Sequence, residues 1–196
     1  MSIRNRLKAM QSGTCAYCER RIYRDDDDKY KGGHIEHFVQ KGGAPHETFN
    51  WDNLFWSCMQ KMSCGRHKDR VDRMTYTHAE LLKPDVDDPA DYLQYDTSGQ
   101  VLPKGDLDPA KLNRAVQTIR VFNLNAREAR LPRLRLDTWA TIEAEVKELQ
   151  EIVADGDFED EELRLERDRI VTDRYTAEFS ACLKSLVEMF VPLPEK

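Results

Sequence analysis

The 196-residue sequence predicts an α+β fold, with short strands in the N-terminal part and helices in the C-terminal half. Two cysteine pairs bracket residues 15–64, a region with little apolar periodicity. Turn residues dominate residues 82–107, and apolar residues recur at helical spacing after Asp108. We therefore expect three regions: a cysteine-containing region over residues 1–75, a connector over 76–108 and a helical region over 109–196.

The composition and the lack of long apolar stretches predict a cytoplasmic protein that does not enter a membrane. Hydrophobic residues make up 40% of the chain and charged residues 34%, an ordinary balance for a globular protein. No segment approaches the roughly 18 apolar residues that a membrane span requires. The first residues, Met1 to Arg4, also lack the apolar core of a signal peptide.

Charge is unevenly distributed along the chain, whose net charge is −6. Residues 1–75 hold 14 Lys and Arg against 10 Asp and Glu, whereas residues 76–196 hold 16 against 26. The mildly basic N-terminal region is therefore compatible with binding to a phosphate backbone, which depends on Lys and Arg. The acidic remainder indicates a partner surface or solvated helix faces.

The N-terminal region is predicted to contain short elements joined by loops. Residues 2–11 have the apolar spacing of a short helix, and the acidic run at residues 25–28 carries too much charge for a core and predicts a loop. His34–Phe38 predicts a short strand, and the aromatic run Phe49–Trp56 is expected to be buried. The basic segment Arg66–Arg73 is expected to begin a helix.

Turn chemistry and helical spacing define the rest of the chain. Residues 92–102 predict a small hairpin around a Thr-Ser-Gly turn. Asp108 followed by Pro109 is typical of a helix start, and that helix is expected to end at Asn123. Helical spacing predicts further helices across residues 134–153 and 163–191.

Four of the five cysteines are spaced as ligands of one structural Zn2+. Cys15 and Cys18 are separated by two residues, a spacing that lets two thiolates reach one tetrahedral ion. Cys58 and Cys64 form a looser second pair. A zinc ion held by these four would stabilise a region with little core of its own, and the alternative is that they are unliganded core residues. Cys182, alone on an apolar helical face, is expected in the core.

Residues between and just after the cysteine pairs are suited to hydrolysing a phosphodiester bond. This reaction needs an activated water and stabilisation of negative charge on the phosphate and the leaving oxygen. His37 is the candidate base, because a neutral histidine accepts a proton near pH 7. Glu36 and His67 are the candidate ligands of a divalent ion, expected to be Mg2+. Asn53 is expected to orient the imidazole through its carboxamide.

Each of these assignments has an ordinary structural alternative. Glu36 and His37 point to opposite faces of a regular strand, so a site that uses both requires a bend. His34 is expected to be structural rather than a further ligand. His46 and His78 have no partner pattern and are expected at the surface. Three nearby cations could meet a phosphate backbone: Lys41, Arg66 and Lys68.

Several runs of the sequence resemble one nuclease family. CAYCE, IEHF, FNWDNLFWSC and SCGRHKD are together similar to the PtuB-type HNH endonucleases of Septu and Septu-like retron antiphage defence systems. The likeness continues in LLKPDVDDPADYL and RAVQTIRVFNLN and covers roughly residues 14–135. The resemblance implies a ββα-metal (HNH) nuclease motif, with His37 as its base, Asn53 as its middle residue and the four paired cysteines as its zinc ligands.

The resemblance also implies a substrate and partners. The substrate would be nucleic acid, either DNA or tRNA. The partners would be a PtuA-like ABC-type ATPase and, in retron versions, a reverse transcriptase with its RNA and DNA. We expect such a partner to bind the acidic helical region over residues 109–196.

One position departs from the family pattern. Many HNH sequences place the last histidine directly after the cysteine, but here Gly65 follows Cys64, and His67 comes two residues later. Asp69 is therefore an alternative ligand to His67. Two other functions fit the same residues: a zinc-stabilised nucleic-acid-binding module without catalysis, and a structural adaptor whose helices bind an ATPase.

Overall fold

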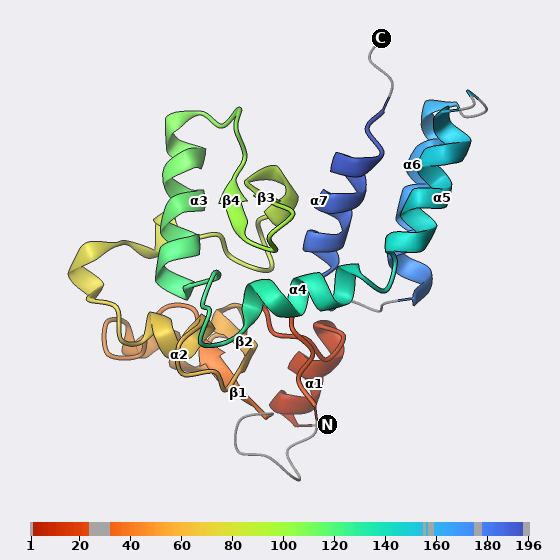
Figure 1. Cartoon of the computed structure of the whole chain (residues 1–196). Helices are drawn as coiled ribbons and strands as arrows, with labels where there is room; N and C mark the ends of the chain where they lie inside the picture. Colours follow the sequence, from red (N-terminus) through yellow and green to blue (C-terminus); the bar gives the residue numbers. More distant parts are fainter. Residues whose placement is uncertain (1, 24–31, 155, 157–158, 175–177, 194–196) are drawn as a thin grey trace.

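The protein is seen here as a computed structural model that describes residues 2–23, 32–154, 156, 159–174 and 178–193 (Figure 1). The acidic run at residues 25–28, predicted to be a loop, lies outside these residues. The described elements are α1 (Ile3–Met10), β1 (Gly33–His37), β2 (Leu54–Cys58), α2 (Cys64–Lys68), β3 (Leu93–Tyr95), β4 (Val101–Pro103), α3 (Pro109–Phe122), α4 (Leu131–Trp139), α5 (Glu143–Ala154), α6 (Asp160–Arg174) and α7 (Ser180–Phe190). This mixture of helices and small sheets confirms the predicted α+β class.

The N-terminal part is built around an antiparallel pair of strands. β1 and β2 pair residue for residue, from Gly33 opposite Cys58 to His37 opposite Leu54. The outer edge of β2 is covered by the Gln11 side chain at the end of α1. The Gln11 amide donates to the Trp56 carbonyl at 2.8 Å, and the Trp56 amide donates to Gln11 Oε1 at 2.7 Å. One side chain thus satisfies a strand edge that would otherwise lack a partner.

Trp56 is the fully buried centre of this sheet. Gly33 lies against its ring, because a Cβ placed on Gly33 would come within 2.5 Å of the indole carbons. Lys8 of α1 covers the ring, with its Nζ 4.7 Å from the ring centroid. The close approach of the β1 backbone to the indole therefore requires glycine at position 33.

The connector contains the predicted hairpin, formed by β3 and β4 as an antiparallel pair. An ion pair attaches the segment before this hairpin to α3. Arg114 Nη2 lies 2.6 Å from Asp87 Oδ2, and Arg114 Nη1 lies 2.9 Å from Asp87 Oδ1. The two parallel contacts form a bidentate pair, which is stronger and more directional than a single charged hydrogen bond.

Replacing Asp87 by Asn is expected to lower the free energy of unfolding by about 2 kcal/mol, because Arg114 loses a charged partner. Burial raises the pKa of Asp87, but the Arg114 hydrogen bonds lower it more, so the net shift is downward from the ordinary value of 3.8. The stabilisation is therefore present above pH 3.8 and is lost as the pH falls through the lowered pKa. Urea unfolding at several pH values measures this, with Asp85→Asn as the control, since Asp85 is more exposed and its partner among the described residues is Lys83. Equal effects of the two substitutions would contradict the assignment.

The C-terminal helices begin as predicted but are more interrupted than the apolar pattern indicates. The Asp108 side chain accepts from the amides of Ala110 and Lys111, and Asn123 ends α3 in the left-handed conformation with φ 45°. The single helix predicted over residues 134–153 is wrong: α4 ends at Trp139 and α5 starts at Glu143.

The breaks in these helices have structural reasons. Ile142, at the break between α4 and α5, is fully buried, and the chain turns there to insert its side chain into the core. The stretch over residues 163–191 is likewise divided into α6 and α7. Phe179, just before α7, has φ 54°, a conformation that an α-helix does not contain.

The buried apolar residues form two clusters. The larger one extends from Leu7 in α1 to Leu186 in α7 and includes residues from both sheets. The smaller one lies among α5, α6 and α7, which run side by side in Figure 1. Glu19 joins the N-terminal part to α7, because its Oε2 accepts from the Ala181 amide at 2.9 Å. None of the described helices is long and apolar enough to cross a membrane.

Candidate active site and metal centre

The four predicted zinc ligands come together in one buried cluster. The Sγ atoms of Cys15, Cys18, Cys58 and Cys64 all lie within 4.8 Å of one another. In a tetrahedral zinc-thiolate site, neighbouring sulfur atoms are about 3.8 Å apart, so this arrangement fits the ion. The first two cysteines follow α1, the third ends β2 and the fourth begins α2. Cys182 lies apart from them and is fully buried, as predicted.

Two of the four predicted catalytic residues, Glu36 and His37, lie on β1 and line one hollow. Within the described residues β1 pairs only with β2, so its other edge borders a solvent-open hollow. The predicted bend between Glu36 and His37 is absent, because the strand keeps its regular pairing through His37. Both residues still line the same hollow, so a site that uses both does not require the bend. Its lining consists of His34, Ile35, Glu36, His37, Gln40, Lys41, Gly42 and Asp69.

His37 is held in one tautomer by the backbone. Its Nε2 lies 3.0 Å from the Thr48 carbonyl oxygen, which only accepts hydrogen bonds, so Nε2 carries the proton and Nδ1 has a free lone pair. Burial lowers the pKa of His37, the hydrogen bond to Thr48 opposes this, and the charge of Lys41 lowers the pKa further. The net downward shift favours the neutral ring that a general base requires.

Asn53 does not contact the imidazole in the way the sequence predicted. Its Oδ1 accepts from the Val39 amide at 2.7 Å, and its Nδ2 donates to the Val39 and Glu47 carbonyls at 3.1 and 3.0 Å. These bonds join the segment after β1 to the 3-10 turn Pro45–Phe49, which contains Thr48. Asn53 therefore positions His37 indirectly, through the backbone that supplies the Thr48 carbonyl.

Glu36 is a buried carboxylate with two side-chain partners. Lys68 Nζ lies 2.6 Å from its Oε1, and His34 Nε2 lies 2.9 Å from its Oε2. Burial alone raises the pKa of Glu36, but the His34 hydrogen bond and the Lys68 charge outweigh burial and lower it. Glu36 is therefore ionised near neutral pH although its side chain is only 3% exposed.

The prediction that Lys68 meets a phosphate backbone is wrong, because its side chain is fully buried. Besides Glu36, its ammonium donates to the carbonyls of His37 and Phe38. The sequence places Lys68 in a basic, polar segment, so no local pattern indicated its burial. Lys41, the second predicted cation, is exposed and lines the hollow. Arg66, the third, is half-buried, and its guanidinium donates a hydrogen bond to the Met59 sulfur.

Replacing Lys68 by Met is expected to lower the free energy of unfolding by about 3–5 kcal/mol. The substitution leaves the Glu36 carboxylate buried without its cation, and the carbonyls of His37 and Phe38 lose the hydrogen bonds that they accept from Lys68. Urea unfolding of the zinc-loaded protein measures the loss, and Lys61→Met is the matched control because Lys61 is exposed. A loss below about 1 kcal/mol would show that the pair contributes little.

The structure directs His67 away from Glu36. Its Nδ1 donates to the Val121 carbonyl at 2.9 Å, so the ring faces α3, and His67 is not among the residues that line the hollow. Gly65 instead backs directly onto Glu36, whose Oε2 would be 2.3 Å from a Cβ at that position. The two predicted ligands of the divalent ion are therefore not brought together, whereas Glu36 and His34 are.

The two histidines expected at the surface differ from each other. His46 has a side chain that is 79% exposed, as predicted. His78 is half-buried, and its ring lies 6.0 Å from that of Phe38 and 5.9 Å from that of Tyr76. The prediction for His78 is therefore wrong, and the reason is aromatic packing that its local sequence does not reveal.

The sequence is similar to that of a protein whose name includes a nuclease activity. No family model matches the chain. Over 138 residues the chain is 25% identical to a protein of Vibrio cholerae serotype O1 biovar El Tor named "Retron Vc95 putative HNH endonuclease". The aligned part covers 67% of this chain and 61% of that protein, so the chain spans less than two thirds of its relative.

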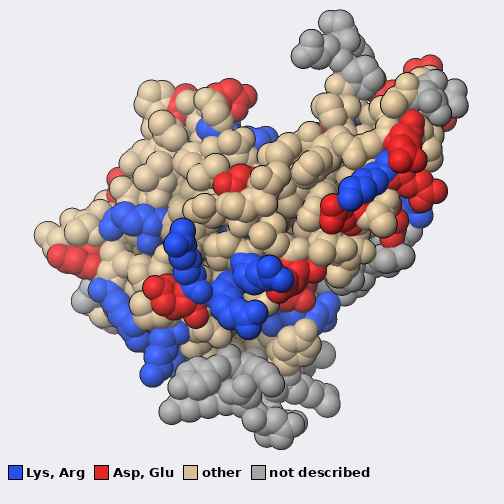
Figure 2. All heavy atoms as spheres, in the orientation of Figure 1, with Lys and Arg blue, Asp and Glu red and all other residues tan. Residues whose placement is uncertain are grey.

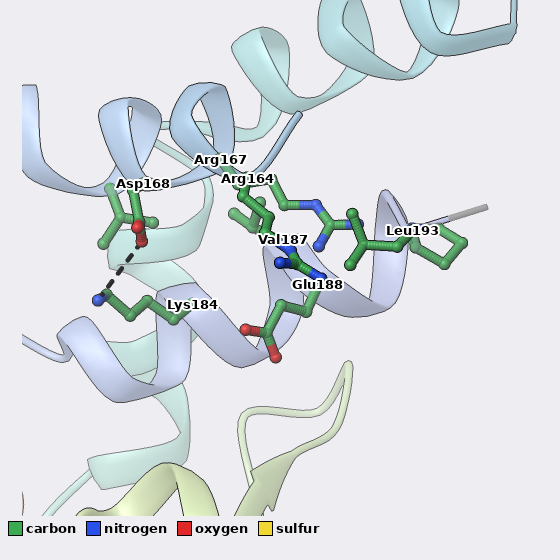
Figure 3. Close-up of a pocket in the computed structure, with 9 residues that line it drawn as sticks. Arg164, Arg167, Asp168, Lys184, Val187, Glu188 and Leu193 are labelled. Atoms are coloured by element: carbon green, nitrogen blue, oxygen red, sulfur yellow. Dashed lines mark ion pairs between the residues drawn. The ribbon is translucent and has the colours of Figure 1, made fainter. Parts of the chain in front are cut away.

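A second hollow lies far from β1, between α6 and α7, and has a different character (Figure 3). Lys184 and Asp168 form an ion pair of 3.5 Å across it, and Arg164, Arg167 and Glu188 complete its charged lining. On the face seen in Figure 2, most basic side chains gather in the lower half, and acidic side chains lie among them and at the upper right. The positive and negative side chains that line this second hollow do not indicate one class of substrate. The residues suited to hydrolysis are those that line the hollow at β1.

Proposed function

We propose that the chain is a metal-dependent HNH endonuclease that hydrolyses phosphodiester bonds in nucleic acid, with β1, β2 and α2 as its ββα-metal motif. The observation that carries this proposal is the juxtaposition of His37 and the ionised Glu36 at one solvent-open hollow, next to the four-cysteine cluster. The similarity to a retron HNH endonuclease supports it.

Each residue of the hollow has a separate role in the proposed hydrolysis. His37 Nδ1 accepts the proton of the attacking water, while the Thr48 carbonyl keeps the opposite nitrogen protonated. Glu36 would hold a divalent ion such as Mg2+, together with a second ligand from the lining of the hollow, which includes Asp69 but not His67. A bound Mg2+ supplies stabilisation of charge on the phosphate and the leaving oxygen. Lys41, exposed at the rim, binds a neighbouring phosphate.

The biological setting is proposed from the family resemblance. In it, the chain is the effector of a cytoplasmic antiphage defence complex that contains a PtuA-like ABC-type ATPase. A reverse transcriptase with its RNA and DNA is a further partner in the retron version, a setting that the name of the Vibrio relative favours. We place the docking surface on the acidic helical region over residues 109–196.

A second candidate function is a zinc-stabilised nucleic-acid-binding protein without catalysis. The observation that favours it is the Lys68 ammonium, which already lies 2.6 Å from the Glu36 carboxylate and neutralises it. A purely structural adaptor for the ATPase is the third candidate.

Binding and cleavage measured on the same samples separate these functions. Zinc-loaded protein, alone and with its ATPase partner, is incubated with closed circular DNA and with tRNA, with and without Mg2+. The nuclease predicts Mg2+-dependent cleavage of at least one substrate. The binding module predicts retention of nucleic acid without cleavage, and the adaptor predicts neither.

A further inference from the structure

The side of α2 that faces Glu36 carries no ligand side chain. Gly65 occupies the position directly after Cys64, where many HNH sequences have their last histidine. A Cβ on Gly65 would lie 2.3 Å from both the carboxyl carbon and Oε2 of Glu36. A histidine at position 65 would therefore displace the carboxylate, and the ring of His67 is directed to the Val121 carbonyl instead.

His34 lies where such a ligand is needed. It is two residues before Glu36 on β1, so both side chains project from the same face of the strand. Its Nε2 is 2.9 Å from Glu36 Oε2. Two adjacent ligand atoms of an octahedral ion, each about 2.1 Å from the ion, are about 3.0 Å apart. The two atoms therefore already have the separation of neighbouring ligands.

Lys68 occupies only one of the two carboxylate oxygens of Glu36. Glu36 Oε1 is in contact with Lys68 Nζ, which is also occupied by two carbonyl groups, so Oε2 is the oxygen that remains for an ion. His34 Nδ1 is buried and has no hydrogen-bond partner among the described residues. Asp69 lines the same hollow and lies within 3.8 Å of Lys68 Nζ, with its side chain 55% exposed.

The charges at the hollow also favour a divalent cation. Glu36 and Asp69 both line the hollow, so two carboxylates face it. Lys68 neutralises only one of these two negative charges. An imidazole nitrogen together with carboxylate oxygens is a donor set that suits Mn2+ and related divalent ions.

We propose that His34 Nε2 and Glu36 Oε2 bind the divalent ion of the nuclease site, and that the exposed Asp69 side chain turns toward them to complete the ligand set. His34 thus takes the role that the sequence assigned to His67. This inference rests on the proposed nuclease function, because it identifies the ligands of that site. The loss of the histidine after Cys64 is compensated from the neighbouring strand, and glycine at position 65 is what allows Glu36 to turn toward His34.

Mn2+ binding tests the inference without relying on activity. Zinc-loaded wild type, His34→Gln and His67→Gln proteins are titrated with Mn2+, and pulsed electron paramagnetic resonance detects nitrogen coordinated to the bound ion. Glutamine at position 34 keeps a hydrogen-bond donor for Glu36 but supplies no coordinating nitrogen. We expect nitrogen coupling in wild type and His67→Gln, and its loss in His34→Gln together with an affinity at least about tenfold weaker.

Asp69→Asn is the second variant, because substitution of a side chain that is 55% exposed is expected to leave folding intact. We expect several-fold weaker Mn2+ binding in this variant with unchanged zinc content. Nitrogen coupling that survives in His34→Gln and disappears in His67→Gln would overturn the assignment, as would a wild type that binds no Mn2+ yet cleaves nucleic acid. Mn2+ binding through His34 without any cleavage would instead leave the ligand set intact and overturn the proposed nuclease function.

Discussion

Replacing His37 by Ala is expected to lower the rate of nucleic acid cleavage by about 10²–10⁴-fold, the usual contribution of a general base. The reason is that the neutral ring, with Nε2 fixed by the Thr48 carbonyl, is the proton acceptor at the hollow. Single-turnover cleavage by zinc-loaded protein in Mg2+ measures the rate. The substitution removes one partly exposed side chain, so zinc content and the free energy of unfolding should change little.

The control for this prediction is His46→Ala. His46 is exposed and lies in the turn Pro45–Phe49, close in sequence to Thr48 but not part of the hollow lining. Its rate is expected to remain within a factor of about two of wild type, since surface substitutions away from a site have small effects. Equal cleavage by wild type and His37→Ala would show that another group takes the proton.

Loss of one zinc ligand is expected to have the largest effect on stability. Wild type should contain about one zinc per chain, and Cys58→Ser should contain almost none. Structural zinc contributes about 10–16 kcal/mol of apparent binding free energy in small domains, and this energy becomes folding energy. Elemental analysis and urea unfolding should therefore show zinc loss together with unfolding of the N-terminal part, where Cys58 joins β2 to the cluster.

Cys182→Ala is the matched control, because Cys182 is equally buried but lies outside the cluster. It should keep its zinc and lose only the modest stability expected for removing a small core atom. A wild type that is folded and free of zinc would contradict the metal assignment and favour the alternative of unliganded core cysteines.

The features that the sequence predicted best depend on local spacing. The spacing of Cys15 and Cys18 identifies two candidate metal ligands by itself. Cys58 and Cys64 are the only other cysteines in the sequence that lie close together. The start of α3 was predictable because Asp108 caps the first turn with its own side chain. The hairpin of β3 and β4 was predictable from its turn residues.

The features that the sequence could not predict depend on which distant groups become neighbours. Lys68 is charged and surrounded by polar residues in sequence, yet it is buried on Glu36, 32 positions earlier in the chain. His67 has a metal-ligating side chain, but the orientation of α2 turns it toward Val121 in α3. Spacing along the chain identifies candidate ligands, whereas the packing of α2 against β1 decides which of them face the hollow.

The break between α4 and α5 illustrates the same limit for secondary structure. Apolar spacing continues through residues 134–153, so periodicity alone does not reveal an interruption. The interruption arises because Ile142 and Val146 pack into the smaller core among α5, α6 and α7, while Leu131 packs into the larger one. The chain changes direction where it passes from one core to the other.

The most direct test of the nuclease function compares wild type with His37→Ala on closed circular DNA and on tRNA. Both proteins are zinc-loaded, and both are assayed with and without Mg2+, alone and with the ATPase partner. We predict that wild type cleaves at least one substrate only when Mg2+ is present, and that His37→Ala retains zinc and nucleic acid binding but loses cleavage. Equal cleavage by the two proteins, or no cleavage by either under every condition, would contradict the proposal.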